Sequence, residues 1–167
     1  MTPFTKVLLA ACALGVAACT SPGQYDRGGL GGGAGEFAAG SPQDPRSMAY
    51  FQQTIGDRVH FAVDESTLGD AARATLLAQA TWLMDNPEYS AIIEGHADEQ
   101  GTREYNLALG ARRAAAVQEF LVSRGVSPAR LRTVSYGKER PIEICSAEAC
   151  YAKNRRAVTV VTAGAGA

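Results

Sequence analysis

The chain has 167 residues, of which 20% are charged, and its formal net charge at pH 7 is −1. A chain of this length suits one folded domain with an additional segment. The balanced charge gives no cationic surface of the kind that nucleic-acid-binding proteins carry, so we expect no nucleic acid partner. Four cysteines are too few to build a disulfide scaffold, so the position of each matters more than their number.

Residues 1–18 have the features of an export signal. A positive charge at Lys6 precedes an apolar run that is shorter than the about 20 apolar residues needed to span a bilayer. The run ends in Val16-Ala17-Ala18-Cys19, which resembles the lipobox of bacterial lipoproteins, where the cysteine becomes the lipidated first residue. Cys12 is a second match behind a shorter apolar run, so we predict lipidation at Cys19. An ordinary cleaved signal peptide is the alternative.

Residues 19–47 are predicted to form a lipidated, flexible tether. They are rich in glycine and contain three prolines, so they offer little to bury and no uninterrupted helix. A flexible chain of about 28 residues has an end-to-end distance of about 30 Å, which is enough to hold a domain clear of a membrane surface. By resemblance to the sorting pattern of lipoproteins, Thr20 favours the outer membrane.

The folded domain is predicted over residues 48–162, with a short tail over 163–167. Its first element is a strand over 58–63, where apolar and polar residues alternate. A helix follows over 68–85, with helix-capping residue types at 64–67 and a stop at Asn86-Pro87. The other predicted elements are a strand over 91–95, a long helix from near Tyr105 to Gly125, a helical turn over 127–130, a strand over 132–136, a short helix over 151–154 and a strand over 156–162.

This order of elements predicts an α/β (α+β) sandwich, with helices packed on one face of a mixed β-sheet. In the middle of the chain, residues 92–114 combine a strand, a polar loop and a helix start. Such a junction brings side chains and unpaired backbone N–H groups around a small anionic ligand.

Arg113 lies on the apolar face of the long helix, one turn after Leu109. A buried arginine needs a partner, so two interpretations stay open. In one, Arg113 forms a structural ion pair with Asp98 or Glu94. In the other, Arg113 and Asp98 are the two poles of a pocket for a zwitterion.

Three segments, GHADEQGTREYNLALGARRA, SYGKERP and YAKNRRAV, resemble the OmpA-like peptidoglycan-binding domain family over residues 59–161. Within that family they resemble the lipid-anchored proteins of the Tol-Pal system. The resemblance implies a non-enzymatic protein without a cofactor, anchored in the outer membrane and facing the periplasm. It implies tethering of the outer membrane to the cell wall, and roles in envelope integrity and in outer-membrane constriction during cell division. The implied partners are peptidoglycan, TolB and the Tol inner-membrane complex.

The resemblance also implies where the ligand binds. Asp98 and Arg113 match the family residues that hold the diaminopimelate of the peptide stem, and Leu109 lines the same pocket. Replacement of either Asp98 or Arg113 by alanine is expected to cause loss of binding with little change in melting behaviour. The other predicted binding residues are Phe61, Asp64, Gly101, Thr102, Asn106 and Arg156, and the segment Asn154-Arg155-Arg156 is expected to border the site. Val63 departs from the aromatic residue that relatives often carry there.

Cys145 and Cys150 are predicted to form a disulfide. Removal of the signal takes Cys12 and lipidation consumes Cys19, which leaves an even pair in an oxidising compartment. Two free buried cysteines are the alternative. This pair is not part of the general family pattern.

A metal-dependent cell-wall hydrolase that uses His96, Asp98 and Glu99 is the alternative function. The only other histidine is His60, and the sequence has no second cluster of metal ligands. We therefore expect a binding protein and no metal. A flagellar stator, which shares this domain, would need a membrane-spanning helix with an ionisable residue.

Overall fold

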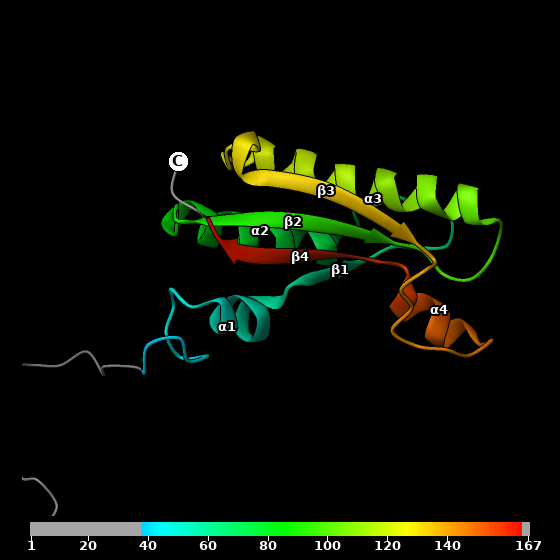
Figure 1. The fold of residues 1–167 in the computed structure, drawn as a ribbon, viewed down its shortest axis with the longest axis horizontal. Helices are drawn as coiled ribbons and strands as arrows, with labels where there is room; N and C mark the ends of the chain where they lie inside the picture. The colour runs from blue at the N-terminus through cyan, green and yellow to red at the C-terminus, as the bar shows by residue number, and fades with distance from the viewer. Residues whose placement is uncertain (1–37, 165–167) are drawn as a thin grey trace, which may run out of the picture. The chain divides into compact units, whose positions relative to one another are not determined.

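Four strands form one mixed β-sheet in the computed structural model, which describes residues 38–164 (Figure 1). They are β1 (Arg58–His60), β2 (Tyr89–His96), β3 (Leu131–Gly137) and β4 (Arg156–Ala163). The strand order is β1-β4-β2-β3, with β2 and β3 parallel and the other two pairs antiparallel. The predicted export signal, the lipidation site Cys19 and most of the predicted tether lie outside the described residues.

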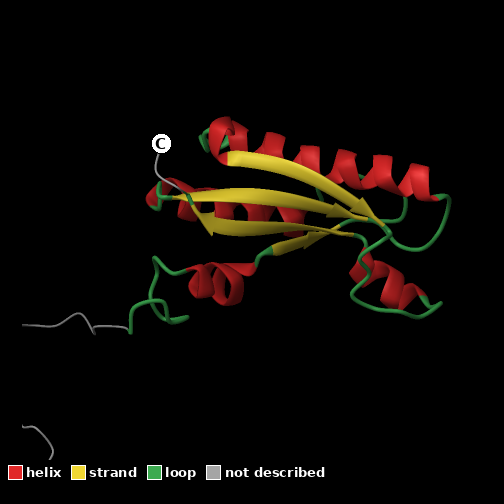
Figure 2. Ribbon diagram, viewed as in Figure 1, coloured by secondary structure: helices red, strands yellow, loops and turns green. Residues whose placement is uncertain are grey.

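Two long helices, α2 (Asp70–Asp85) and α3 (Arg103–Ser123), lie on one face of this sheet (Figure 2). The burial of β2 shows the same one-sided packing, because Ala91 and Ile93 are buried whereas Ile92 between them is 36% exposed. The shorter helical elements are α1 (Met48–Tyr50), the π-helix η1 (Phe51–Gly56), the 3₁₀ turn η2 (Pro128–Arg130) and α4 (Glu148–Asn154). The predicted fold class is therefore confirmed.

The region between β1 and α2 differs from its prediction. The first strand ends at His60 instead of continuing to Val63, since the chain turns at Asp64, which has a positive φ of 58°. Residues 64–67 do not cap α2. The helix begins at Asp70 with Gly69 at its N-cap and no side-chain cap hydrogen bond. This segment instead directs its backbone toward α3, as the site geometry shows.

Residues before the predicted domain start also pack onto it. The Trp82 indole N–H donates to the carbonyl oxygen of Pro45 over 2.7 Å, and the hydroxyl of buried Ser47 accepts from the Tyr50 N–H. Phe51 is fully buried against Trp82, with 4.9 Å between ring centroids. The η1 segment had no expected structure, because its six residues carry too little periodicity to reveal a helical turn.

A close approach of α3 to β2 sets the position of the site. A Cβ atom on Gly95 would overlap the backbone carbonyl of Gly110, so only glycine at this position permits the observed spacing. As a result, Arg113, one turn after Gly110, reaches the carbonyl oxygen of His96 at the end of β2. The buried face of α3 otherwise carries apolar residues, among them Leu109, Val117, Phe120 and Leu121, as the helical spacing of these residues indicates.

Candidate functional site

A cleft of about 270 Å³ lies between the segment after β1, the loop after β2 and the start of α3. Both charged groups that line it are carboxylates, from Asp64 and Asp98. Five predicted binding residues line this cleft, Asp64, Asp98, Gly101, Asn106 and Leu109, and Val63, Gln100 and Tyr105 complete it. Thr102 lies at its edge, where the hydroxyl accepts from the Tyr105 N–H over 3.2 Å and caps α3.

Arg113 lies beneath this lining and is completely buried. Its guanidinium donates to three backbone carbonyl oxygens. Nε donates to Glu65 over 2.7 Å, Nη1 to His96 over 2.8 Å and Nη2 to Ala62 over 3.1 Å. The ring centroid of Phe61 is 5.1 Å from Cζ, so this predicted binding residue supports the arginine instead of lining the cleft.

Within residues 38–164 Arg113 forms no ion pair with Asp98 or Glu94, so the first of the two open interpretations is wrong. Carbonyl dipoles hold the guanidinium without neutralising it. Burial lowers the pKa of Arg113 to about 10, against the opposing effect of the Asp98 charge, so the side chain stays protonated at neutral pH. A guanidinium has five N–H groups, and the three bonds leave two of them for other acceptors.

The burial of Arg113 argues against the expectation that its alanine variant would melt like the wild type. Truncation would leave three carbonyl oxygens without their donor, the buried one of His96 and the partly buried ones of Glu65 and Ala62. Such groups cost free energy whenever they stay unpaired. The side chain is thus a structural connection between the segment after β1, the end of β2 and α3, whatever else it does.

The carboxylate of Asp98 is fixed from two sides. Oδ1 accepts from the Gln100 N–H over 3.2 Å, and Oδ2 accepts from Nη1 of Arg155 over 3.1 Å. The Asp98 and Arg155 side chains are 8% and 5% exposed. Arg155 also donates to the Phe61 carbonyl over 3.3 Å and to the carboxylate of Glu148 on α4.

Arg155, not the predicted Arg156, is thus the arginine that reaches the site. Arg156 donates to the carbonyl oxygens of Asn154 and Arg140 and does not line the cleft. Neighbouring residues of an extended segment point to opposite sides. The two-residue alternation of β4, whose Ala157 and Thr159 are buried toward the helices, is the sequence signal that favours Arg155.

Asn106 offers the cleft an acceptor. The side chain is 1% exposed, and its Nδ2 donates to the Gln100 carbonyl over 2.7 Å. Its Oδ1 is buried and has no hydrogen-bond partner among the described residues. The opposite wall is closed by Tyr105, whose hydroxyl donates to Asp64. The cleft is thus lined by two carboxylates and the buried Asn106 side chain, and the charges of both carboxylates act on the buried Arg113.

His96 does not contribute its ring to this cleft. The imidazole is 2% exposed, lies 5.6 Å from the Tyr136 ring centroid, and has its pKa lowered to about 4 by burial and then by Arg156 and Arg140. Nε2 is 3.6 Å from Glu94, too far for a hydrogen bond. Within residues 38–164 no three His, Cys, Asp or Glu side chains are grouped so that they could hold a metal ion.

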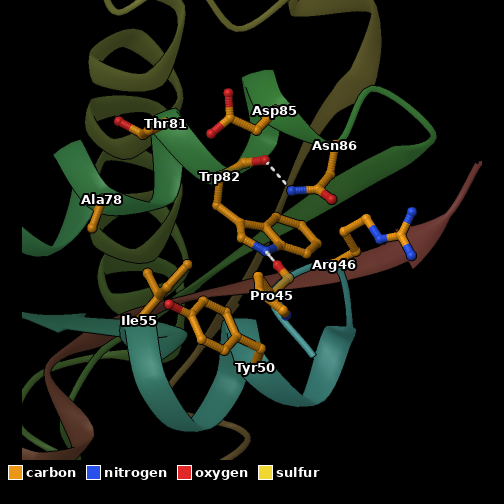
Figure 3. Close-up of a pocket in the computed structure, with 9 residues that line it drawn as sticks. All are labelled: Pro45, Arg46, Tyr50, Ile55, Ala78, Thr81, Trp82, Asp85 and Asn86. Atoms are coloured by element: carbon orange, nitrogen blue, oxygen red, sulfur yellow. Dashed lines mark hydrogen bonds between the residues drawn. The ribbon is translucent and has the colours of Figure 1, made fainter. Parts of the chain in front are cut away.

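A larger cavity of about 430 Å³ lies elsewhere, between α2 and the segment before α1 (Figure 3). Trp82 forms one wall, and its indole N–H connects the two segments by donating to the Pro45 carbonyl oxygen. The Asn86 side chain donates to the Trp82 carbonyl oxygen within the end of α2. The cavity does not combine a buried cation with facing carboxylates. We therefore assign the site to the smaller cleft.

Known proteins share this fold and much of this sequence. Residues 60–155 match the OmpA family. The chain is 53% identical to the peptidoglycan-associated lipoprotein of Brucella melitensis, over 92% of this chain and 88% of the relative. It is 52% identical to the peptidoglycan-associated lipoprotein of Rhizobium meliloti, over 92% and 84%.

Solved structures agree. The crystal structure of the peptidoglycan-associated lipoprotein from Burkholderia pseudomallei matches with a TM-score of 0.65 and 39% identity, over 72% of this chain and 98% of the other. The C-terminal domain of Helicobacter pylori MotB, at 22% identity and a TM-score of 0.60 over 65% and 86%, shares the fold. In the part of the chain described here, no helix has the length and apolar character to cross a membrane.

Proposed function

Because the chain belongs to the OmpA family and, within it, to the peptidoglycan-associated lipoproteins, we propose that it binds the diaminopimelate of peptidoglycan stems non-covalently. One observation carries the proposal. The carboxylates of Asp98 and Asp64 line the cleft, and their charges act on Arg113, which is buried yet keeps its own charge. The side-chain end of diaminopimelate has one ammonium and one carboxylate, so it complements both signs.

The ammonium is held by Asp98, with the unpartnered Oδ1 of Asn106 as a second acceptor. The ligand carboxylate faces the two remaining N–H groups of Arg113 and the N-terminal turn of α3, which starts beside Gly101 and carries positive dipole charge. Each charge-assisted hydrogen bond contributes about 1.5–3 kcal/mol. Leu109 supplies the apolar wall.

The binding test compares two synthetic stem peptides that differ only in diaminopimelate or lysine. By calorimetry, the mature chain should bind the diaminopimelate peptide at least tenfold more tightly, because lysine lacks the carboxylate. Asp98→Asn should lose about 2–5 kcal/mol of binding free energy, since the ligand ammonium then stays unpaired. Asp85→Asn, an exposed change on α2, is the matched control. Equal affinity for both peptides would refute the mechanism.

We further infer that the chain tethers the outer membrane to the wall through acyl chains on Cys19, as the lipobox and the relatives' names suggest. One acyl chain gives marginal anchoring, and several make it stable. Cys19→Ser should remove palmitate labelling and release the protein from the membrane fraction, whereas Cys12→Ser should do neither. Retained label in Cys19→Ser would move the lipidation site to Cys12.

We also propose that the protein takes part in the Tol-Pal system, with TolB and the Tol inner-membrane complex as partners. Its proposed roles are in envelope integrity and in outer-membrane constriction. The support for this proposal is family membership. Photo-crosslinking in intact cells from the polar residues Glu99, Arg103 and Glu139 should capture TolB, and the absence of any such product would contradict it. We infer a non-enzymatic role, since Asp98 is engaged by Arg155 and the His96 ring is directed elsewhere.

A further inference from the structure

The carboxylate of Asp98 is the buried end of a chain of charges that leads from the cleft to the surface at Glu148. Arg155 donates to Asp98 with one guanidinium nitrogen and to Glu148 with the other. Burial acts to lower the pKa of Arg155, but the hydrogen bonds to Glu148 and then to Asp98 outweigh it and raise that pKa. The cation therefore stays charged and is shared between two carboxylates.

This sharing affects what Asp98 can offer a ligand. If Arg155 faced Asp98 alone, the pair would be neutral and would attract an ammonium only weakly. With Glu148 on the other side, the cluster of two carboxylates and one guanidinium keeps one net negative charge. Within this cluster, Asp98 lines the cleft, whereas Glu148 is 64% exposed on α4.

The two ends of α4 are supported differently. At the C-terminal end, the fully buried Asn154 accepts from the N–H groups of Ile142 and Glu143 and donates to the Glu143 carbonyl. At the N-terminal end, Ala147 provides no side-chain cap. A seven-residue helix is marginal without tertiary support. Here the support is a disulfide.

The disulfide joins Cys150, in the first turn of α4, to Cys145 in the preceding loop, with 6.0 Å between Cα atoms. It closes the segment that carries Glu148. Figure 1 places α4 at the end of the sheet from which the loop to α3 departs. The disulfide therefore holds Glu148 where Arg155 can reach it.

We propose that Glu148, fixed by the Cys145–Cys150 disulfide, is a positioning residue for ligand binding that shares the charge of Arg155 and so leaves Asp98 negative for an ammonium. The inference rests on the proposed function of the same cleft. It assigns a task to a cysteine pair that the ligand itself does not touch. It also requires that Glu148 act on the ammonium of the ligand and not on the rest of the stem.

The test uses two diaminopimelate stem peptides, one with a free side-chain amine and one with that amine acetylated. In the mature, oxidised chain, Glu148→Gln should weaken binding of the free-amine peptide about two- to fivefold, the range of a solvent-screened charge pair. Affinity for the acetylated peptide should not change. Glu143→Gln is the matched control, because this carboxylate pairs with Lys153 at the other end of α4.

A second variant, Cys145→Ser with Cys150→Ser, should reproduce the loss for the free-amine peptide, and adding Glu148→Gln to it should change little more. An unchanged affinity in Glu148→Gln would overturn the inference, as would an equal loss for both peptides, which indicates a merely structural role. If the wild type binds the free-amine peptide and Glu148→Gln binds it equally well, only this inference fails. If the wild type binds neither peptide, the proposed function fails with it.

Discussion

Two buried arginines meet at the cleft, and they are held in opposite ways. Arg113 is surrounded by backbone carbonyl oxygens from Ala62, Glu65 and His96. Arg155 is bound mainly by carboxylates, from Asp98 and Glu148. Both residues are buried, with at most 4% of their surface exposed, so burial alone does not distinguish them.

The difference lies in the charge that remains. Carbonyl dipoles stabilise a guanidinium but carry no net charge, so Arg113 is a positive pole under the cleft. Carboxylates neutralise Arg155, so it acts as a support for Asp98. A binding site for a zwitterion needs one group of each kind: a cation left uncompensated, and an anion held in place without being cancelled.

The largest expected effect tests the hydrogen bonds from Arg113 to backbone carbonyl oxygens. Arg113→Ala should lower the free energy of unfolding by about 3–5 kcal/mol, because a completely buried side chain leaves a cavity and the His96, Glu65 and Ala62 carbonyl oxygens lose their donor. Urea unfolding followed by circular dichroism measures it. Arg112→Ala, at the neighbouring exposed position, is the control and should change stability little. A near-native stability for Arg113→Ala would mean that the carbonyls find other donors.

The next effect concerns the residue that links Arg113 to the sheet. The His96 carbonyl holds Arg113, while its ring has its pKa lowered from 6.5 to about 4 by burial, then by Arg156 and Arg140. A lowered folded-state pKa means that the unfolded chain takes up the proton first as pH falls. Stability is therefore full above pH 6.5 and declines between pH 6.5 and 4, by up to about 3 kcal/mol.

His96→Gln should flatten this decline in urea unfolding measured across the same pH range. His60 has its pKa shifted in the same direction, by burial and by Arg58 and Arg156, but its exposed ring is screened by solvent. His60→Gln should therefore leave most of the decline in place. A decline that persists unchanged in His96→Gln would assign it to the carboxylates instead.

Much of the fold could be predicted because it rests on periodic patterns. The face of α2 formed by Ala72, Leu76, Ala80 and Leu83 is buried as expected, and Asn86 ends the helix. The end of β1 could not be predicted, since Val63 continues the alternation in the sequence while the chain has already turned away from the sheet. Alternation reports side-chain polarity, not where backbone pairing stops.

Residues that line the cleft could be predicted from the sequence, but the hydrogen-bond partners of the arginines beside it could not. Asp98, Asn106 and Leu109 lie where the loop and helix spacing indicates. The partners of Arg113 left no sequence signal, because every residue carries a carbonyl oxygen and nothing in its side chain reveals which one will be used. The role of Arg155 depends on Glu148, whose helix position is set by a disulfide outside the motif that carries the resemblance.

A smaller effect tests whether the segment that carries Glu148 is independent of the surroundings of Arg113. Cys145→Ser with Cys150→Ser should lower the free energy of unfolding by about 2 kcal/mol, since the closed loop is short. Amide hydrogen exchange should accelerate at Glu148 and Tyr151 and stay unchanged around Arg113. Reduction of the wild type provides the comparison and should give the same pattern. Faster exchange around Arg113 would show that the two sides are not independent.

The smallest effect tests how each arginine is coupled to Asp98. A double-mutant cycle with Asp98→Asn and Arg155→Gln should give a coupling energy of about 1–2 kcal/mol, because the two side chains share a buried hydrogen bond. The parallel cycle with Asp98→Asn and Arg113→Lys should give less than about 0.5 kcal/mol, since Arg113 is held by carbonyl oxygens and only the longer-range charge connects it to Asp98. Both cycles use urea unfolding in one buffer, without ligand, and share the wild type and Asp98→Asn. Equal coupling in the two cycles would mean that the arginines are interchangeable supports of Asp98, and the distinction between a free cation and a neutralised one would no longer hold.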